Sequence, residues 1–283
     1  MKLETVILMK TAIYIKNPSL AGDGRFRAMT AALEAAGAVV YPVGGDGHLE
    51  PDTDVLIAAG GDGTILSAAR LAAEASIPVL GVNFGRLGFL SEYKWEEAVK
   101  ALMDGDYSVE SRTLLQASIT PATGLESIDA WPYALNEVCV HRTGASMLGV
   151  DVRIGGAALP TYWADGLLVA TSSGSTAYSL SVGGPIVLPE SEVLIVSPIS
   201  PHNLNVRPLI VPDSTTIELG FQTRDGRLML TLDNRTVEIG PSFSIRISKA
   251  PFPLVRVRLN RSNFIDALVS KLFWGEDIRN NIK

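Results

Sequence analysis

Continuous apolar runs alternate with helical patterns along the first third of the chain. The runs predict strands over 11–15, 38–43, 55–59 and 78–82. Ala- and Leu-rich patterns between and after them predict helices over 24–37, 64–76 and 94–105. Apolar strands separated by helices are typical of a parallel sheet that is covered on both faces. The first part of the chain is therefore predicted to be a Rossmann-like α/β domain.

From about residue 113 onward, short strands follow one another with turn residues between them. They are predicted over 114–120, 133–141, 149–154, 166–171, 192–198, 215–221, 227–232, 236–239 and 242–248. This spacing predicts an all-β second domain with one helical insertion at 176–181. A final helix over 261–272 is expected to return to the first domain. We therefore expect residues 1–112 and 258–283 to form the first domain and residues 113–257 the second.

Two stretches of the chain read Gly-Gly-Asp-Gly. Gly60–Gly63 lies directly between the predicted strand 55–59 and the predicted helix 64–76. A glycine-rich turn at that place presents free backbone N–H groups and the positive end of a helix dipole, which together bind phosphate. Gly44–Gly47 is followed by Pro51, which leaves no room for a helix directly after the loop. Gly60–Gly63 is therefore the candidate phosphate loop, and Gly44–Gly47 is interpreted as a turn.

Asp62 is unexpected in a loop that binds only anions, because a carboxylate repels phosphate. Two uses of this carboxylate fit the position. It can ligate a metal ion through water, or it can accept a proton from a hydroxyl nucleophile. The residue pattern alone leaves both open.

The segment from Trp163 to Pro185 carries a second group of polar residues. Asp165 precedes a predicted strand, a loop rich in hydroxyl groups and glycine follows, and Gly183 and Gly184 end a short helix. A Walker loop is excluded because Gly-Lys-Ser/Thr is absent. Hydroxyl groups can hydrogen-bond to ribose or phosphate, and Tyr178 can stack on a base.

Asn136 and Glu137 stand next to each other inside an apolar predicted strand. Adjacent residues of a strand point to opposite faces, so only one of the two would face a pocket unless the strand bends. A carboxylate such as that of Glu137 can accept hydrogen bonds from a ribose diol.

Composition narrows the class of protein further. The formal charge is 24 minus 30, or −6, which disfavours a nucleic-acid partner, since that binding depends on Lys and Arg. Cys139 is the single cysteine, so an intramolecular disulfide is excluded, and we predict a small buried apolar residue there. No apolar run reaches the roughly 18–20 residues of a membrane span. A cytoplasmic protein without a membrane partner is expected.

Taken together, the loops resemble the NAD kinase family. The motifs follow the family's order: Gly60–Thr64, Asn83–Leu90, Asn136-Glu137, Gly174–Pro185, and Pro201–Leu204 with Arg207-Pro208. The sequence departs from the family pattern at Ser67, where an arginine is common, and at Trp163, where the residue is often basic. It also reads Ser172 in place of a usual proline and Asp233-Asn234-Arg235 in place of Asp-Gly-Gln.

The resemblance implies a Rossmann-like first domain, a β-sandwich second domain that binds NAD, and a site to which both contribute. It implies that Asp62 is the general base and that Gly61 and Gly63 border the triphosphate. Asn136 and Glu137 would hold a nucleotide, and Asp165 the nicotinamide end. The NAD pocket would be lined by Phe84, Thr176, Ala177, Tyr178, Ser179, Leu180 and Ser181.

The activity that the resemblance implies is transfer of the terminal phosphoryl group of ATP to the 2′-hydroxyl of the adenosine ribose of NAD, giving NADP. Polyphosphate is an alternative donor. Mg²⁺ would be held mainly by the phosphates, and the protein would assemble as a homodimer or homotetramer. Two other functions stay open: a lipid kinase of the diacylglycerol-kinase type, which shares the Gly-Gly-Asp-Gly-Thr loop, and an NADP sensor that has lost catalysis.

Overall fold

The computed structural model describes residues 9–44, 47–85, 88–121 and 125–275. The chain divides into two compact units. Unit 1 comprises Met1–Glu110 with Val255–Lys283, and unit 2 comprises Ser111–Leu254. Parts of two sequence motifs, residues 45–46 and 86–87, lie outside the described residues.

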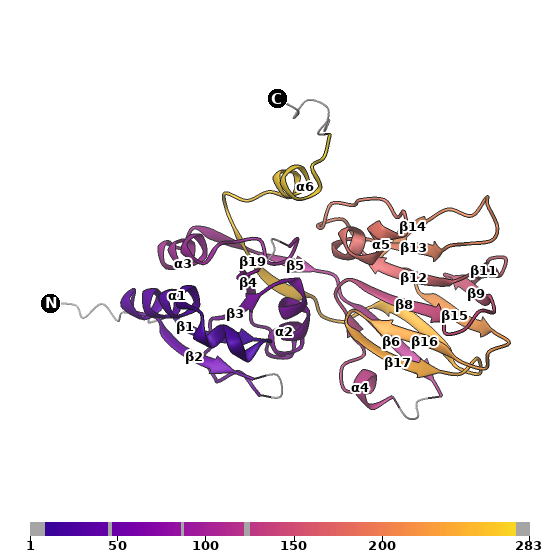
Figure 1. The fold of residues 1–283 in the computed structure, drawn as a ribbon, viewed down its shortest axis with the longest axis horizontal. Coiled ribbons are helices and arrows are strands. Elements are labelled where there is room, and N and C mark those ends of the chain that lie inside the picture. The colour runs from indigo at the N-terminus through magenta and orange to yellow at the C-terminus, as the bar shows by residue number, and fades with distance from the viewer. Residues whose placement is uncertain (1–8, 45–46, 86–87, 122–124, 276–283) are drawn as a thin grey trace. The chain divides into compact units, whose positions relative to one another are not determined.

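Unit 1 is built on one six-stranded sheet with the order β2-β1-β3-β4-β19-β5 (Figure 1). Its strands are β1 (Lys10–Ile15), β2 (Val39–Val43), β3 (Val55–Gly60), β4 (Val79–Asn83), β5 (Tyr107–Arg112) and β19 (Leu254–Leu259). Strands β1 to β4 pair in parallel. The strand order reverses direction between β1 and β3, and in open α/β sheets such a switch point is where ligands bind, outside the carboxyl ends of the strands.

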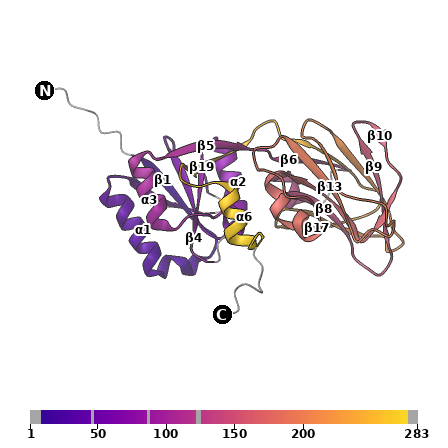
Figure 2. The same cartoon turned by 90° about the horizontal axis from the view of Figure 1, so that it is seen from above.

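Helices cover both faces of this sheet (Figures 1 and 2). They are η1 (Pro18–Gly22), α1 (Gly24–Ala35), α2 (Asp62–Ala75) and α3 (Trp95–Asp104), and a further helix of this unit, α6 (Phe264–Leu272), follows β19 in the chain. Helices α1 and α3 share one apolar core with the strands, in which Leu33 and Leu102 are buried beside Ile57. Helix α2 packs on the other face, where Gly81 of β4 lets the Ile65 side chain come close: a Cβ at Gly81 would lie 2.3 Å from Ile65 Cδ1.

Strand β19 was not predicted from the sequence. It is the last strand of the chain, yet it lies between β4 and β5 in the sheet of unit 1. It follows all of unit 2 and then pairs in parallel with β4. Arg256 is 6% exposed in this strand, and two carboxylates compensate its charge: Glu92 at 3.0 Å and Glu110 at 3.4 Å. The predicted return of the C-terminal helix is confirmed, because Phe264 of α6 packs against Phe89 of unit 1 with ring centroids 6.1 Å apart.

Unit 2 is a sandwich of two sheets. A seven-stranded sheet contains β6 (Leu115–Thr120), β7 (Tyr133–Ala134), β9 (Leu148–Ile154), β10 (Ala157–Ala158), β11 (Tyr162–Ala164), β15 (Ile217–Gln222) and β18 (Ser244–Lys249). A six-stranded sheet contains β8 (Glu137–Arg142), β12 (Gly166–Thr171), β13 (Val193–Ile199), β14 (Leu209–Pro212), β16 (Leu228–Leu232) and β17 (Arg235–Ile239). Short helices lie at α4 (Glu126–Asp129), η2 (Ser173–Thr176) and α5 (Tyr178–Ser181).

Alternate residues of both sheets form the core of unit 2. Val138 and Val140 of β8 and Leu167 and Val169 of β12 point into one buried cluster with residues of the opposite sheet, such as Leu219. The period of two along each strand, with one face toward the other sheet, is the pattern of a β-sandwich.

The single strand predicted over 133–141 is wrong. The chain pairs with β6 as β7, turns at Leu135 and Asn136, and continues as β8 in the other sheet. The apolar pattern does not reveal this corner because both halves are buried. The predicted helix 176–181 is likewise divided into η2 and α5.

Candidate functional site

The Gly-Gly-Asp-Gly loop of unit 1 joins β3 directly to α2. Gly60 is required by packing: its φ is 155°, and a Cβ there would lie 2.2 Å from Thr64 Oγ1. A Cβ at Gly61 or Gly63 would meet no atom within 4 Å. Gly61 is the N-cap of α2, and no side chain caps the first turn. The Thr64 N–H donates to Gly61 O at 2.8 Å, so the N–H groups that precede it are the ones available to a ligand. The loop therefore offers a bare, positively polarised backbone to an anion.

The Asp62 side chain turns to the segment after β4. Its Oδ1 accepts hydrogen bonds from Leu90 N at 3.1 Å, Ser91 N at 2.8 Å and Ser91 Oγ at 2.9 Å. Its Oδ2 accepts from Phe89 N at 2.9 Å. A Cβ at Gly88 would lie 1.9 Å from Asp62 Oδ1, so glycine is needed for this approach.

The two carboxylate oxygens of Asp62 differ in how many further hydrogen bonds they can accept. Each carboxylate oxygen has about two lone-pair sites. Three donors from the described residues occupy Oδ1, whereas one donor occupies Oδ2. Oδ2 therefore has more capacity left than Oδ1 to accept a further hydrogen bond, and the donors on Oδ1 hold the side chain in place.

Phe84, predicted near the NAD pocket, lies in the core of unit 1. It is 9% exposed, and its ring centroid is 6.0 Å from that of Phe26. Its backbone N–H donates to Gly60 O at 3.2 Å, which ties the chain after β4 to the start of the phosphate loop.

In unit 2, the corner between β7 and β8 brings several predicted residues together. Asn136 and Glu137 are both buried, each 8% exposed. Asn136 O accepts from Thr171 N at 2.9 Å, and Gly174 lies so close that a Cβ would be 2.1 Å from the same oxygen. The structure thus joins the Asn136-Glu137 pair to the hydroxyl-rich loop after β12.

Glu137, Cys139 and His141 occupy alternate positions of β8 and share the face that α5 covers. The Tyr178 ring stacks on the His141 ring at 5.5 Å with an interplanar angle of 27°. Burial and the nearby Asp233 raise the pKa of Glu137 to about 8, although a backbone hydrogen bond at Tyr178 opposes the shift. Glu137 Oε2 is buried and has no hydrogen-bond partner among the described residues. The surroundings therefore favour the protonated form of this carboxyl.

Burial also changes the other two side chains of this face. It raises the pKa of the Cys139 thiol and lowers the pKa of His141, a shift that the charge of Asp165 opposes. Cys139 is 2% exposed, so the prediction of a buried apolar residue is confirmed and a thiolate nucleophile is disfavoured. Neutral His141 offers one donor and one acceptor nitrogen.

Asp165 precedes β12 and is paired with Arg142, whose Nε lies 2.6 Å from Asp165 Oδ1. The charge of Asp165 reaches the group around Tyr178 as well, because it contributes to the raised pKa of that phenol, whose main cause is burial. The predicted residues from 176 to 181 differ in access. Ser179 is buried against Gly184, Ser181 is exposed, and partly buried are Thr176, Ala177, Tyr178 and Leu180.

Three residues of the candidate site were missed from the sequence. Ser91 donates to the side chain of Asp62, and the side chain of Asp233 accepts from the backbone of residues 135–137. Both contacts join segments that are distant in the sequence, which no local pattern shows. His141 carried a usable signal, because it stands four residues after Glu137 and therefore on the same face of the strand. Arg235, to which no role was assigned, donates to Trp131 O and Tyr133 O.

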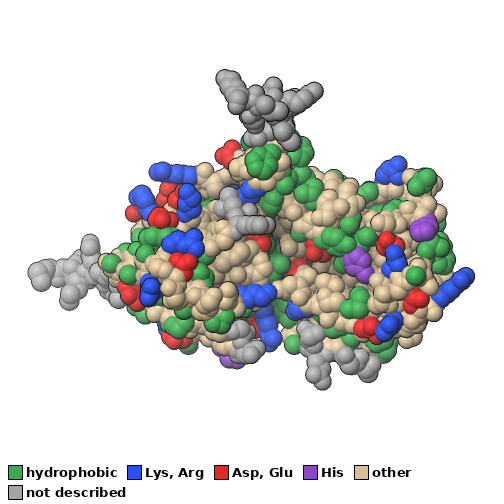
Figure 3. Space-filling view, viewed as in Figure 1, with side chains coloured by type: hydrophobic (Ala, Val, Ile, Leu, Met, Phe, Trp, Pro, Cys, Tyr) green, Lys and Arg blue, Asp and Glu red, His purple; other side chains and the backbone are tan. Residues whose placement is uncertain are grey.

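No group of three or more His, Cys, Asp or Glu side chains that could hold a metal ion occurs among the described residues. Within the same part of the chain, no helix is long and apolar enough to cross a membrane. On the face shown in Figure 3, acidic and basic side chains are interspersed over both units.

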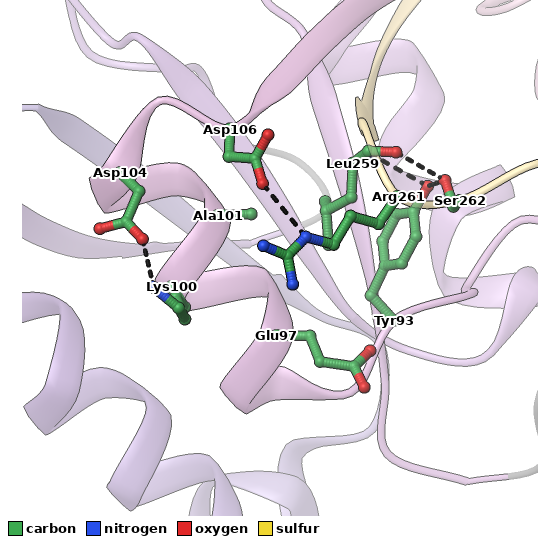
Figure 4. A pocket seen from close by; sticks show the side chains of 9 residues that line it. All are labelled: Tyr93, Glu97, Lys100, Ala101, Asp104, Asp106, Leu259, Arg261 and Ser262. Carbon is green, nitrogen blue, oxygen red and sulfur yellow. Dashed lines mark hydrogen bonds and ion pairs between the residues drawn. The ribbon is translucent and has the colours of Figure 1, made fainter.

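A cavity of about 350 Å³ in unit 1 lies apart from the predicted site residues (Figure 4). It is lined by Tyr93, Glu97, Lys100, Ala101, Asp104, Asp106, Leu259, Arg261 and Ser262. Within it, the Tyr93 hydroxyl and Ser262 Oγ are 2.9 Å apart. Since the phosphate loop and Asp62 do not border it, this cavity is not the candidate active site.

An α/β unit with an uncapped Gly-Gly-Asp-Gly loop, followed in the chain by a β-sandwich unit, fits a phosphoryl-transfer enzyme. Two sequence profiles match the chain: the ATP-NAD kinase N-terminal domain over residues 42–105 and the ATP-NAD kinase C-terminal domain over residues 135–259. The chain belongs to the NAD kinase family.

Relatives at substantial identity agree with this assignment. An NAD kinase of Flavobacterium psychrophilum is 40% identical over 236 residues, which are 82% of this chain and 80% of that protein. An NAD kinase of Porphyromonas gingivalis is 44% identical over 230 residues, 80% of this chain and 78% of that protein.

Two solved structures are similar in fold. The crystal structure of an NAD kinase from Archaeoglobus fulgidus in complex with ATP has a TM-score of 0.71 at 28% identity and covers 89% of this chain and 95% of that chain. Yeast NADH kinase complexed with NADH has a TM-score of 0.81 at 23% identity and covers 96% of this chain and 89% of that chain. At that identity the yeast structure supports the fold alone.

Proposed function

We propose that this protein is an NAD kinase that transfers the terminal phosphoryl group of ATP to the adenosine 2′-hydroxyl of NAD. The observation that carries the proposal is the Asp62 carboxylate at the first turn of α2, held by residues 89–91 with one oxygen open to a further donor. Family membership supplies the identity of the two substrates, since the relatives are named NAD kinases.

In the proposed reaction, Asp62 Oδ2 accepts the proton of the 2′-hydroxyl as its oxygen attacks the γ-phosphorus. A new O–P bond forms, the bond from phosphorus to the β,γ-bridging oxygen breaks, and ADP leaves. The backbone N–H groups at Gly61 and Gly63 stabilise the triphosphate, because no side chain competes for them. In-line transfer of this kind is catalysed mainly by positioning and charge neutralisation.

Mg²⁺ fits this site as a partner of the phosphates. Mg²⁺ in kinases is commonly bound by one or two carboxylates together with substrate phosphates, and Asp62 supplies a carboxylate at the first turn of α2. Bound there, the ion neutralises charge on the transferred group. Asp62 is the carboxylate of the loop that would contact it, directly or through water.

For unit 2 we propose the NAD site. Asn136 and Glu137 would bind a ribose or phosphate group of NAD, Asp165 the nicotinamide end, and Tyr178 would stack on a base. The arrangement supports this because Tyr178 packs on the face of β8 that carries Glu137, and the charge of Asp165 reaches Tyr178. On that face a buried carboxyl oxygen of Glu137 has no partner among the described residues. The family resemblance further supports a cytoplasmic homo-oligomer, which light scattering of the purified protein would measure.

The test is NADP formation by purified protein with NAD, ATP and Mg²⁺, run beside the Asp62→Asn variant. We expect NADP from the wild type and a loss of several powers of ten in kcat for the variant, with NAD affinity retained. A loss of less than about tenfold would be below the usual worth of a catalytic base and would remove that role from Asp62. NAD binding without turnover by the wild type would instead support a sensor.

A further inference from the structure

The corner between β7 and β8 is held by a residue from a hairpin almost a hundred positions later in the chain. Asp233 begins the two-residue loop that joins β16 to β17. Its Oδ2 accepts from Leu135 N at 2.7 Å, and its Oδ1 accepts from Asn136 N at 2.8 Å and Glu137 N at 3.1 Å. Asp233 N donates in return to Glu137 O at 3.0 Å. Four hydrogen bonds therefore connect one residue to three successive residues of the corner.

The backbone N–H groups of this corner need hydrogen-bond acceptors from outside the corner. Residues 135 and 136 lie between strands of two different sheets, so their N–H groups have no ladder partner, and buried N–H groups without partners are costly. A carboxylate is the short side chain that can accept from three N–H groups at once. Its place in the hairpin loop, at a φ of 51°, is one that Asp and Asn tolerate better than most residues.

The opposite side of the corner is held by Thr171. Its Oγ1 donates to Leu135 O at 2.6 Å, and its N–H donates to Asn136 O at 2.9 Å. The N–H groups of the corner thus face Asp233, while its carbonyl groups face the start of the hydroxyl-rich loop. Asn136 and Glu137 project from a backbone that is fixed on both sides.

Asp233 and Glu137 also interact as charges. Burial raises the pKa of Asp233, while the N–H groups of residues 135–137 that face its two oxygens oppose this shift. In its ionised form Asp233 adds to burial in raising the pKa of Glu137. The other titratable groups that sense Glu137 are Cys139 on the same strand and Tyr178 of α5, and Arg235 lies beside Asp233.

We propose that Asp233 is a positioning residue of the NAD site, which fixes the backbone of Asn136 and Glu137 through its four hydrogen bonds to residues 135–137. The proposal rests on the function proposed above. It assigns a role in substrate binding to a residue of the β16–β17 hairpin that itself touches no substrate.

The main test is the Asp233→Asn variant, assayed for NADP formation. Asparagine keeps one acceptor oxygen and the φ of the loop, but it sets an NH₂ group against an N–H group of the corner and removes the charge. We expect the KM for NAD to rise about tenfold, the worth of one hydrogen bond to a charged group, while the KM for ATP and kcat change less than about threefold.

A pH profile separates positioning from general damage to the fold. In the wild type the KM for NAD is expected to change with an inflection near pH 8, where Glu137 titrates. Loss of the Asp233 charge removes one cause that raises the pKa of Glu137, so the inflection moves to lower pH in Asp233→Asn. It disappears in Glu137→Gln. In the Glu137→Gln background, Asp233→Asn should raise the KM for NAD less than it does alone.

Asp225→Asn is the matched control. Asp225 also sits in a turn of unit 2 and accepts from a backbone N–H, that of Ser146 at 3.3 Å, but it has no bond to residues 135–137. We expect its KM for NAD and its pH profile to equal those of the wild type. An unchanged KM for NAD in folded Asp233→Asn, or an equal rise in Asp225→Asn, would overturn the proposal.

Two further outcomes are distinguishable. If Asp233→Asn does not fold, Asp233→Glu replaces it, since it keeps the charge but moves the carboxylate away from the N–H groups of residues 135–137, and an unchanged KM for NAD there contradicts the proposal. If the wild type forms no NADP, the proposed function fails first. If the wild type turns over normally and Asp233→Asn has the same KM for NAD as the wild type, only the positioning role of Asp233 is contradicted.

Discussion

Ser91 donates two hydrogen bonds to one oxygen of Asp62: its backbone N–H and its hydroxyl lie 2.8 Å and 2.9 Å from Asp62 Oδ1. Together with the N–H groups of Phe89 and Leu90, they set the direction of the carboxylate. Such contacts orient the carboxylate. A general base needs this orientation because it works only within hydrogen-bond reach of the proton that it accepts.

Gly88 tests this orientation directly. A Cβ in Gly88→Ala would lie 1.9 Å from Asp62 Oδ1 and 2.5 Å from Oδ2, so the carboxylate must move. We expect kcat to fall by about a hundredfold, the typical effect of a misplacement near 1 Å, with the KM for ATP nearly unchanged. Steady-state kinetics measure this. Gly85→Ala is the control, because a Cβ there meets no atom within 4 Å, and an equal loss in both variants would contradict the explanation.

Glu137 predicts a pH dependence of stability. Its pKa is raised from 4.5 to about 8 in the fold, so its contribution is fully present below pH 4.5 and is lost as pH rises to about 8. Each pH unit in this interval removes up to about 1.4 kcal/mol. Above pH 6.5 this loss is separate from that of His141, whose lowered pKa costs stability only as pH falls below 6.5.

The melting temperature of the Glu137→Gln variant should therefore fall less than that of the wild type between pH 6.5 and 8. Scanning calorimetry measures both. Glu238→Gln, an exposed glutamate of β17 with 52% side-chain exposure, serves as the control. A slope that is the same in wild type and Glu137→Gln would mean that Glu137 is already ionised in the folded protein.

Lys271 of α6 predicts a stabilising substitution. Its Nζ is buried without a hydrogen-bond partner among the described residues, and it lies 4.9 Å from the centroid of the Phe89 ring. Burial is the main cause that lowers its pKa. Lys271→Met keeps a chain that packs on the ring and should raise stability by about 1 kcal/mol. Lys100→Met, at an exposed position of α3, is the control in thermal unfolding.

Arg256 predicts a large loss of stability. Replacement by Met leaves Glu92 and Glu110 partly buried without the guanidinium, and breaking a buried ion pair typically costs about 3–5 kcal/mol. Arg258→Met on the same strand is the matched control, because Arg258 is 47% exposed and its Nε is 3.7 Å from Glu110. Denaturant unfolding of both variants measures the difference. Equal losses would place the effect in the strand rather than in the buried charge.

Local patterns predicted the parts of the fold that local forces determine. The run Val55–Ala59 is buried throughout, and a glycine-rich turn and a helix follow it, so β3, the loop and α2 could be identified from neighbouring residues. The corner at Asn136 could not, because what turns the chain there is a carboxylate 97 positions away. Strand β19 escaped prediction for a related reason: Arg256 is tolerated inside a sheet only because two distant glutamates accompany it.

The place of β19 has a consequence for the order in which the protein is made. Residues 111–254 form a continuous unit that has all of its strands once that stretch has left the ribosome. The sheet of unit 1 has a gap between β4 and β5 until β19 is synthesised. An N-terminal unit usually folds first during translation. Here the sheet of unit 1 cannot be completed before β19 is made, and until then the edge of β4 lacks the partner strand that it has in the finished sheet.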